Sequence, residues 1–197
     1  FSQDMTLRPL AAYYKNPADD PETTLQLFPE GGNLVAGLKQ RVAWEVRNQQ
    51  GRTLEGTLSV TTPDGQVIAS ETINRGRGIF EVTVPANQRL TAEFHDNPTG
   101  PLPATTMLKA EDDGVALRVD TDTAGISISC ATAGLASQEE LGITVMCKGI
   151  LMHFQKIDAA PIHLPLSKAG VYQVTVFNQD GRVYADRLCF YLPSGFQ

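Results

Sequence analysis

Hydrophobic and polar residues alternate along most of this chain with a period of two. In one such segment Val42, Trp44 and Val46 fall on one side, whereas Glu45 and Arg47 fall on the other. Successive side chains of a β-strand point to opposite faces, so this period indicates half-buried strands. We expect strands near residues 25–28, 41–47, 54–61, 66–72, 78–84, 89–94, 105–110, 114–120, 125–132, 141–148, 150–156, 161–165, 170–177 and 182–191.

Three short polar stretches end in glycine and separate alternating segments: Asn48–Gly51, Thr62–Gly65 and Asn178–Gly181. Glycine supplies the positive φ of a tight reversal, and Asn or Asp caps its own turn. We expect each stretch to join antiparallel neighbours. A helical period does not extend over three turns anywhere in the sequence, and residues 136–141 are expected to form one helical turn at most.

The sequence predicts an all-β fold of two tandem immunoglobulin-like antiparallel β-sandwiches. Its 197 residues suit two domains of that size. Three prolines fall within six residues near the middle of the chain, and prolines this dense do not fit a central strand. We expect a linker or leading arm at 1–22, a first sandwich at 23–97, a Pro-rich link at 98–103 and a second sandwich at 104–197.

The run Phe28-Pro29-Glu30-Gly31-Gly32, followed by Leu34 and Gly37, resembles the F-P-E-G-G-x-L-x-x-G signature of macroglobulin-like β-sandwich domains in bacterial cell-envelope proteins. Residues 170–190 are similar to the closing hairpin of that family. The resemblance covers roughly residues 23–192. It implies macroglobulin-like sandwiches within a larger multidomain protein that is periplasmic, outer-membrane-associated or extracellular, with a scaffolding or binding role.

Family members that trap proteases use a thioester built from a Cys-Gly-Glu-Gln motif. Cys130, Cys147 and Cys189 are not followed by Gly-Glu-Gln, so the sequence lacks that chemistry. The three cysteines lie in strand-like runs, and we expect core thiols, because free cysteine behaves as a small buried hydrophobe. One disulfide with one free thiol is the alternative. Zinc is disfavoured, because the ligand spacing is missing.

The signature also has a physical interpretation of its own. Phe28 is expected to anchor the strand end in the core, and Pro29 to end the hydrogen-bonded ladder. Gly31 and Gly32 then allow backbone angles closed to other residues and make a sharp corner between sheets. An anion-binding nest at the two glycines is the alternative.

Charge and hydropathy exclude two classes of partner. Sixteen Lys and Arg against 22 Asp and Glu give a net charge of −6, which argues against nucleic acid. The sequence has no run of 18 apolar residues, so no transmembrane segment is expected. The start, Phe1-Ser2-Gln3-Asp4, fits either the residues after a removed signal peptide or a cut within a longer protein.

Candidate chemistry is sparse. His153 lies in an apolar segment, His163 in an edge-like segment and His95 beside the expected link, and no two are spaced as a metal pair. No Gly-x-Ser-x-Gly elbow occurs. The acidic stretches 111–114 and 120–122 suit solvated turns, with calcium as the alternative. We expect no catalytic, cofactor-binding or metal site, and therefore no enzyme.

Aromatic residues do not form an obvious platform for a sugar. Trp44 shares its face with apolar neighbours and is expected in the core, and the tyrosines are scattered (Tyr13, Tyr14, Tyr172, Tyr184 and Tyr191). The leading hypothesis is a non-enzymatic structural or protein-interaction module, whose protein partner docks on a sheet edge or near residues 96–103. The alternatives are a carbohydrate- or surface-ligand-binding module and a hydrolase with a dispersed triad.

Overall fold

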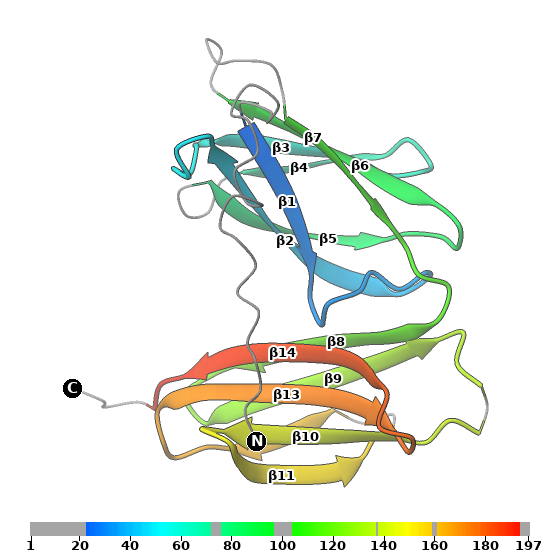
Figure 1. Ribbon diagram of the computed structural model, residues 1–197, viewed down its shortest axis with the longest axis vertical. Coiled ribbons are helices and arrows are strands. Elements are labelled where there is room, and N and C mark those ends of the chain that lie inside the picture. The colour runs from blue at the N-terminus through cyan, green and yellow to red at the C-terminus, as the bar shows by residue number, and fades with distance from the viewer. Residues whose placement is uncertain (1–22, 72–75, 97–103, 137, 159–160, 194–197) are drawn as a thin grey trace, which may run out of the picture.

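The computed structural model describes residues 23–71, 76–96, 104–136, 138–158 and 161–193, and its regular elements are all β-strands (Figure 1). The expected all-β fold is confirmed, and each expected segment contains a strand. The expected arm at 1–22 and link at 98–103 lie outside the described residues. The strands are β1 (Thr23–Pro29), β2 (Lys39–Asn48), β3 (Gly56–Thr61), β4 (Val67–Glu71), β5 (Arg77–Thr83), β6 (Arg89–Asp96), β7 (Ala104–Lys109), β8 (Gly114–Thr121), β9 (Gly125–Ala133), β10 (Leu141–Cys147), β11 (Ile150–Lys156), β12 (Ile162–Pro165), β13 (Gly170–Asn178) and β14 (Val183–Tyr191).

The first sandwich packs a three-stranded sheet, in the order β1-β2-β5, on a four-stranded sheet, β4-β3-β6-β7. Trp44 of β2 fills the space between them and is 1% exposed, as its sequence pattern predicts. Its indole Nε1 donates a hydrogen bond of 3.1 Å to Ser70 Oγ, and its ring centroid lies 5.8 Å from that of Phe94. Gly78, which pairs with Trp44 in the next strand, leaves room for the ring.

The second sandwich packs the sheet β11-β10-β13-β14 on the sheet β12-β9-β8 and has a separate hydrophobic core. Tyr172 and Tyr191 are both 1% exposed there, and their rings meet edge to face at 6.4 Å. The hydroxyl of Tyr191 donates a hydrogen bond of 2.8 Å to the carbonyl of Leu166. The two sandwiches are stacked end to end: β8 and β14 lie next to the first sandwich, whereas β11 lies at the far end (Figure 1).

The expected start of the second sandwich at residue 104 does not match the strand pairing. β7 pairs along its whole length with β6, and Ala104 and Ala110 belong to the core of the first sandwich. The first sandwich therefore extends to about Glu111, and the second begins with β8. Sequence alternation could not show this, because β7 has the same pattern whichever sheet it joins.

The turns agree with the sequence in all but one respect. Asn178 and Asn48 each accept a hydrogen bond on the backbone carbonyl from the glycine three residues later, and their side chains cap the same turn. Asn178–Gly181 joins the paired strands β13 and β14, and Thr62–Gly65 joins β3 and β4. After Asn48–Gly51, however, the chain crosses to the other sheet, because β3 does not pair with β2.

One smaller expectation is corrected. Phe28 is 48% exposed and lies on the outer face of its sheet, in register with Ala43 and Ile79, rather than in the core. The expectation of one helical turn at most at residues 136–141 agrees with the structure, which has no helix among the described residues there. A hydrogen bond of 3.0 Å from the backbone N–H of Glu139 to the carbonyl of Ala136 closes a single turn.

The described residues contain no helix of the length and apolarity that crossing a membrane requires.

Candidate functional site

The two sandwiches meet around the carboxylate of Glu30, which directly follows β1. This side chain is 5% exposed. Arg41 of β2 donates to both of its oxygens, from Nε to Oε2 at 2.5 Å and from Nη2 to Oε1 at 2.9 Å. The backbone N–H of Val119 in β8 donates to Oε1 at 3.0 Å. One buried carboxylate thus accepts hydrogen bonds from both sandwiches.

A second guanidinium approaches the same carboxylate from the other side. Nε of Arg187, in β14, lies 3.0 Å from Oε1 of Glu30, in an ion pair that lacks hydrogen-bond geometry. Glu30 is therefore bracketed by one arginine from each sandwich. Removing water from a carboxylate costs several kcal/mol unless it is paired and hydrogen-bonded, and here it is both. The hydrogen bond to Glu30 raises the pKa of Arg41 above its ordinary value.

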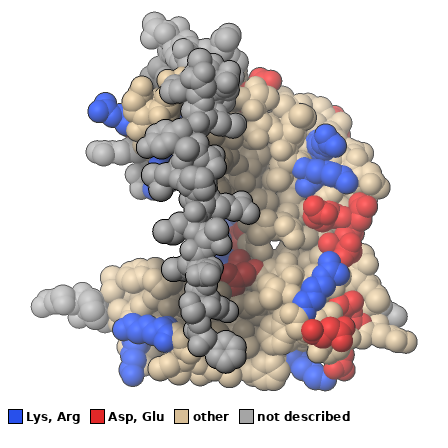
Figure 2. Space-filling model, viewed as in Figure 1, with Lys and Arg blue, Asp and Glu red and all other residues tan. Residues whose placement is uncertain are grey.

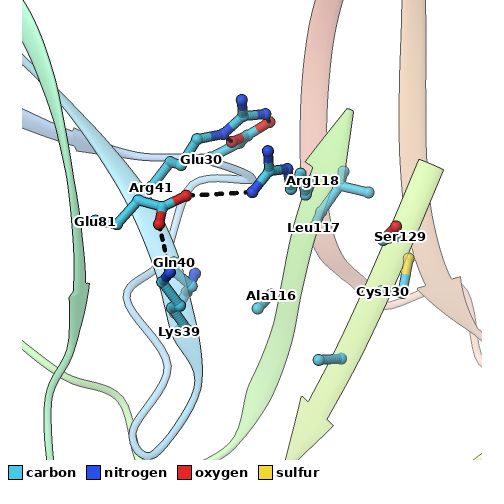
Figure 3. A pocket seen from close by; sticks show the side chains of 11 residues that line it. Glu30, Lys39, Gln40, Arg41, Glu81, Ala116, Leu117, Arg118, Ser129 and Cys130 are labelled. Carbon is cyan, nitrogen blue, oxygen red and sulfur yellow. Dashed lines mark hydrogen bonds and ion pairs between the residues drawn. The ribbon is translucent and has the colours of Figure 1, made fainter. Parts of the chain in front are cut away.

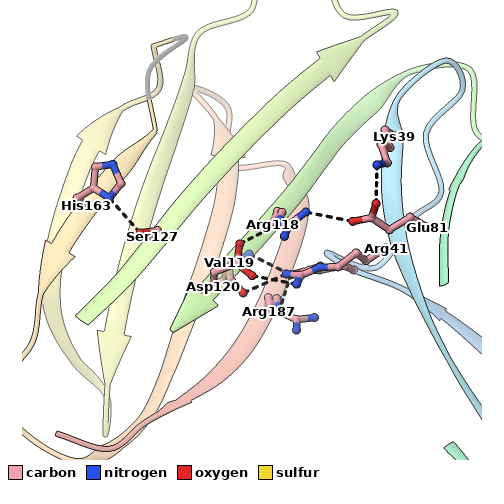
Figure 4. A network of polar contacts seen from close by, with 10 residues as sticks. Lys39, Arg41, Glu81, Arg118, Val119, Asp120, Ser127, His163 and Arg187 are labelled. Carbon is pink, nitrogen blue, oxygen red and sulfur yellow. Dashed lines mark hydrogen bonds and ion pairs between the residues drawn. The ribbon is translucent and has the colours of Figure 1, made fainter. Parts of the chain in front are cut away.

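A chain of charges continues from this centre across the junction (Figure 4). Asp120 pairs with Arg41 Nη1 at 2.9 Å and with Arg118 Nε at 2.7 Å. Arg118 reaches back to Glu81 of the first sandwich at 3.2 Å, and Lys39 pairs with Glu81 at 2.5 Å. Three ion pairs therefore cross the boundary between the domains: Glu30–Arg187, Arg41–Asp120 and Glu81–Arg118.

The pKa values of these carboxylates reflect that pairing. Burial acts to raise the pKa of Asp120, but the hydrogen bond from Arg118 and the charge of Arg41 outweigh it, so the pKa is lowered. The hydrogen bond from Lys39 lowers the pKa of Glu81. Asp120 and Glu81 are both partly exposed, so solvent weakens their ion pairs, and each contributes less to stability than the buried contacts of Glu30.

The backbone after Glu30 touches the second sandwich directly. Gly31 has a φ of +90°, and its carbonyl accepts a hydrogen bond of 3.1 Å from the backbone N–H of Asp186 in β14. A Cβ at this position would lie 3.0 Å from Leu117 Cβ and 3.3 Å from Ala185 Cβ. The positive φ expected for this glycine is confirmed, and its missing side chain permits the close approach of the two domains.

The segment of chain that joins the two sandwiches is also held by backbone hydrogen bonds. Glu111 donates to the carbonyl of Leu34 at 2.7 Å and accepts from the N–H of Ala36 at 2.8 Å, which makes a parallel bridge to Val35. Only residues 112–113 lie between this bridge and β8. The acidic stretch at 111–114 is therefore the short linker between the sandwiches.

A cavity of about 170 Å³ opens beside this network, between β2 and β5 of one sandwich and β8 and β9 of the other (Figure 3). Its charged lining residues pair with each other, and Ser129 and Cys130 complete the opposite wall. Burial raises the pKa of the Cys130 thiol to about 11. Because a nucleophilic cysteine needs a lowered pKa, this thiol does not suit nucleophilic catalysis. The charged residues of this lining are engaged in ion pairs, two of which lie within the first sandwich and one of which joins the sandwiches.

The histidines singled out by the sequence are not brought together. His153 Nε2 lies 2.9 Å from Gln155 Oε1 on β11. His95 lies in β6 opposite Thr57, and its Nε2 is 3.8 Å from the carboxylate of Glu93; the expected link that follows it lies outside the described residues. The cavity between the sandwiches has no histidine among its lining residues.

One serine–histidine pair bears on the hydrolase alternative. Ser127 Oγ lies 2.9 Å from His163 Nδ1, and the two residues face each other across β9 and β12. The nearby Asp122 accepts hydrogen bonds from the backbone N–H groups of Ala124 and Gly125, which makes it a turn cap. Among the described residues no carboxylate forms a hydrogen bond or ion pair with His163, so in this part of the structure the pair lacks the orienting acid that a catalytic imidazole needs.

The acidic residues and cysteines also have definite places. Asp120 was expected in a solvated turn, but it belongs to the charge chain described above. In the part of the chain that the structure describes, no three His, Cys, Asp or Glu residues are placed to hold a metal ion. All three cysteines are free and half-buried. Cys147 and Cys189 flank Tyr172 on opposite sides in the sheet, so two strand spacings (about 10 Å) separate them, beyond disulfide reach.

The sequence interpretation missed two features. The first is the role of Glu30, although a conspicuous signal existed: a carboxylate between apolar residues and two glycines in a distinctive signature. The second is the set of exposed aromatics. Tyr172, Tyr184 and Tyr191 are buried, and Tyr13 and Tyr14 lie outside the described residues. The aromatic side chains that β11 and β13 place on their outer face are phenylalanines.

Comparison with known proteins yields only distant likenesses among solved structures. No protein-family model matches the chain, and no curated protein matches it. Among solved structures, the fibronectin(III)-like modules of Clostridium thermocellum CbhA are 10% identical, covering 85% of this chain and 94% of that one, with a TM-score of 0.29. The tandem Ig repeats of Dlar are also 10% identical, covering 87% and 97%, with a TM-score of 0.33. The native alpha-2-macroglobulin of E. coli is 12% identical, and the match covers 88% of this chain but 14% of that one, with a TM-score of 0.31. Likenesses this low say nothing about what this chain binds or does.

Proposed function

We propose that this chain is a non-enzymatic structural and protein-interaction module of a larger extracytoplasmic protein, in which two β-sandwiches are held in one fixed orientation. The observation that carries the proposal is the shared carboxylate of Glu30, which is bound by Arg41 from one domain and by Val119 and Arg187 from the other. Two domains that moved freely would not retain a buried carboxylate that needs partners from both.

The F-P-E-G-G signature supports the same proposal. Its glutamate supplies the central acceptor of the junction, and its first glycine allows a close approach of the backbone to the second sandwich. The signature thus has a physical purpose in joining a sandwich to its neighbour, which suits macroglobulin-like domains arranged in tandem. We take the two units as residues 23–111 and 114–193, and the parent protein as a bacterial cell-envelope protein.

Small-angle X-ray scattering tests the fixed orientation. We expect the scattering of the chain to fit one arrangement of the sandwiches, and Glu30→Gln to increase the radius of gyration. The matched control is Glu45→Gln, because Glu45 is also bound by two arginines, Arg47 and Arg77, but entirely within the first sandwich. Equal scattering of Glu30→Gln and the unchanged chain would overturn the proposal.

The hydrolase alternative has its own test. A screen against ester and peptide substrates should show no turnover, because Ser127 and His163 lack an orienting acid among the described residues. Turnover that disappears in Ser127→Ala would replace the proposed function with an enzymatic one.

A further inference from the structure

Strand β11 presents an unpaired edge at the end of the molecule that points away from the first sandwich (Figure 1). It pairs with β10 on one side, and no described strand pairs with it on the other. Its apolar side chains are exposed to solvent: Ile150 by 65%, Leu151 by 56% and Phe154 by 56%. An unpaired strand edge is a template for pairing with another chain.

This edge lacks the charges and prolines that several other edges of the sandwiches carry, although a β-bulge at Met152 interrupts its pairing with β10. Natural edge strands avoid association by carrying charges, prolines or bulges, or by being very short. β5 carries Arg77 and Glu81, β8 carries Arg118 and Asp120, and the four-residue β12 ends in Pro165. β11 has no charged residue or proline from Ile150 to Gln155, and Lys156 stands at its end.

The apolar surface continues from β11 onto the outer face of its sheet. The rings of Phe154 and Phe177 stack with centroids 6.3 Å apart across the intervening Gly142. Leu188 and Phe190 of β14 are 63% and 60% exposed. In Figure 2, the part of the second sandwich that faces the viewer and is not hidden by grey atoms shows almost no charged side chains at its centre.

We propose that β11 pairs with β11 of a second copy of this chain, antiparallel about a two-fold axis, so that two four-stranded sheets become one continuous sheet. Antiparallel pairing puts the two Lys156 side chains at opposite ends, each near the apolar Ile150 of the other copy. Like charges therefore do not face each other across the seam, and Lys156 keeps its ion pair with Glu140. This inference goes beyond the proposed function and does not depend on it.

The pairing closes as a dimer. A two-fold interface uses the same strand in both copies, so neither retains a free β11 edge. The opposite edge of the sheet, β14, faces the first sandwich and carries Arg187, which is bound to Glu30. The exposed side chains of one strand bury less than the ~800 Å² per partner of a standard interface, so we expect a weak dimer with a dissociation constant of order micromolar.

Sedimentation equilibrium of the full chain tests this pairing. We expect a monomer–dimer equilibrium. Leu151→Lys should raise the dissociation constant of the dimer at least ~10-fold, because a charge on the edge disfavours strand addition. The matched control is Met107→Lys, an equally exposed apolar residue in the edge strand β7 (63% exposed), which should leave the equilibrium unchanged. Phe154→Lys serves as the test variant if Leu151→Lys does not fold by circular dichroism.

Hydrogen exchange locates the interface. Amide protection within residues 150–156 should rise with protein concentration in the unchanged chain and in Met107→Lys. A chain that stays monomeric at about 0.5 mM would overturn the proposal. So would a dimer whose concentration-dependent protection lies outside β11, or one that the lysine in β11 leaves intact.

Discussion

The backbone N–H of Val119 donates a hydrogen bond of 3.0 Å to the side chain of Glu30, across the boundary between the two sandwiches. Val119 follows Glu30 by 89 positions in the chain. A buried carboxylate of the first domain is thus satisfied by the main chain of a strand in the second. This contact, together with the ion pairs around it, supports the proposal that the two domains have one fixed orientation.

Removing the charge of Glu30 should destabilise the chain. We expect Glu30→Gln to lower the free energy of unfolding by about 2–3 kcal/mol, because Arg41 and Arg187 lose their shared partner in a site that is mostly closed to water. Urea unfolding followed by tryptophan fluorescence and circular dichroism measures the change. A loss no greater than that of an exposed carboxylate would contradict the buried role of Glu30.

The glycines that follow Glu30 separate a backbone effect from an interface effect. Both have positive φ, +90° at Gly31 and +108° at Gly32, so alanine strains either position. Only at Gly31 would the new Cβ meet the second sandwich; at Gly32 nothing lies within 4 Å. We expect Gly31→Ala to cost about 1–3 kcal/mol more than Gly32→Ala in urea unfolding. Equal costs would mean that the close approach at Gly31 contributes nothing.

Trp44 should behave as a core residue. We expect Trp44→Ala to cost about 3–5 kcal/mol, because the ring is buried and its indole is bonded to Ser70. Thermal and urea unfolding of the purified variant measure the loss. A variant that melts like the unchanged chain would place Trp44 outside the core.

Acid should weaken the junction. The pKa values of Asp120 and Glu81 are lowered from ordinary values of 3.8 and 4.5. Their contribution to stability is therefore present above those values and is lost as the pH falls through the lowered ones. We expect Arg118→Gln, which removes a partner of both, to reduce the loss of stability between about pH 5 and pH 2.5. Identical acid profiles of the two proteins would count against this coupling.

Cys130 should resist thiol reagents. With Cys147→Ser and Cys189→Ser in place, Cys130 is the sole thiol, and burial raises its pKa to about 11. At pH 8 it should react with an aromatic disulfide reagent far more slowly in the folded protein than in urea, because thiolate is scarce. Comparable rates in the two conditions would show that the thiol is accessible and ionised.

Local features of the molecule could be predicted from sequence, and nonlocal ones could not. The strands and the caps at Asn48 and Asn178 follow from alternation and turn chemistry, which involve neighbouring residues. The membership of β7 depends on pairing with β6, and the position of Phe28 depends on which face its sheet buries. The site around Glu30 depends on partners such as Val119 and Arg187, which are distant in sequence and were visible only once the second sandwich was in place.

The most direct test of the fixed orientation is a set of residual dipolar couplings measured by NMR on the weakly aligned chain. We expect the couplings of residues 23–96 and 114–193 to fit a single alignment tensor with the two sandwiches oriented as in the structure. In Glu30→Gln the two sets should require tensors of different magnitude, whereas in Glu45→Gln they should still share one. Separate tensors for the two sandwiches in the unchanged chain would contradict the account.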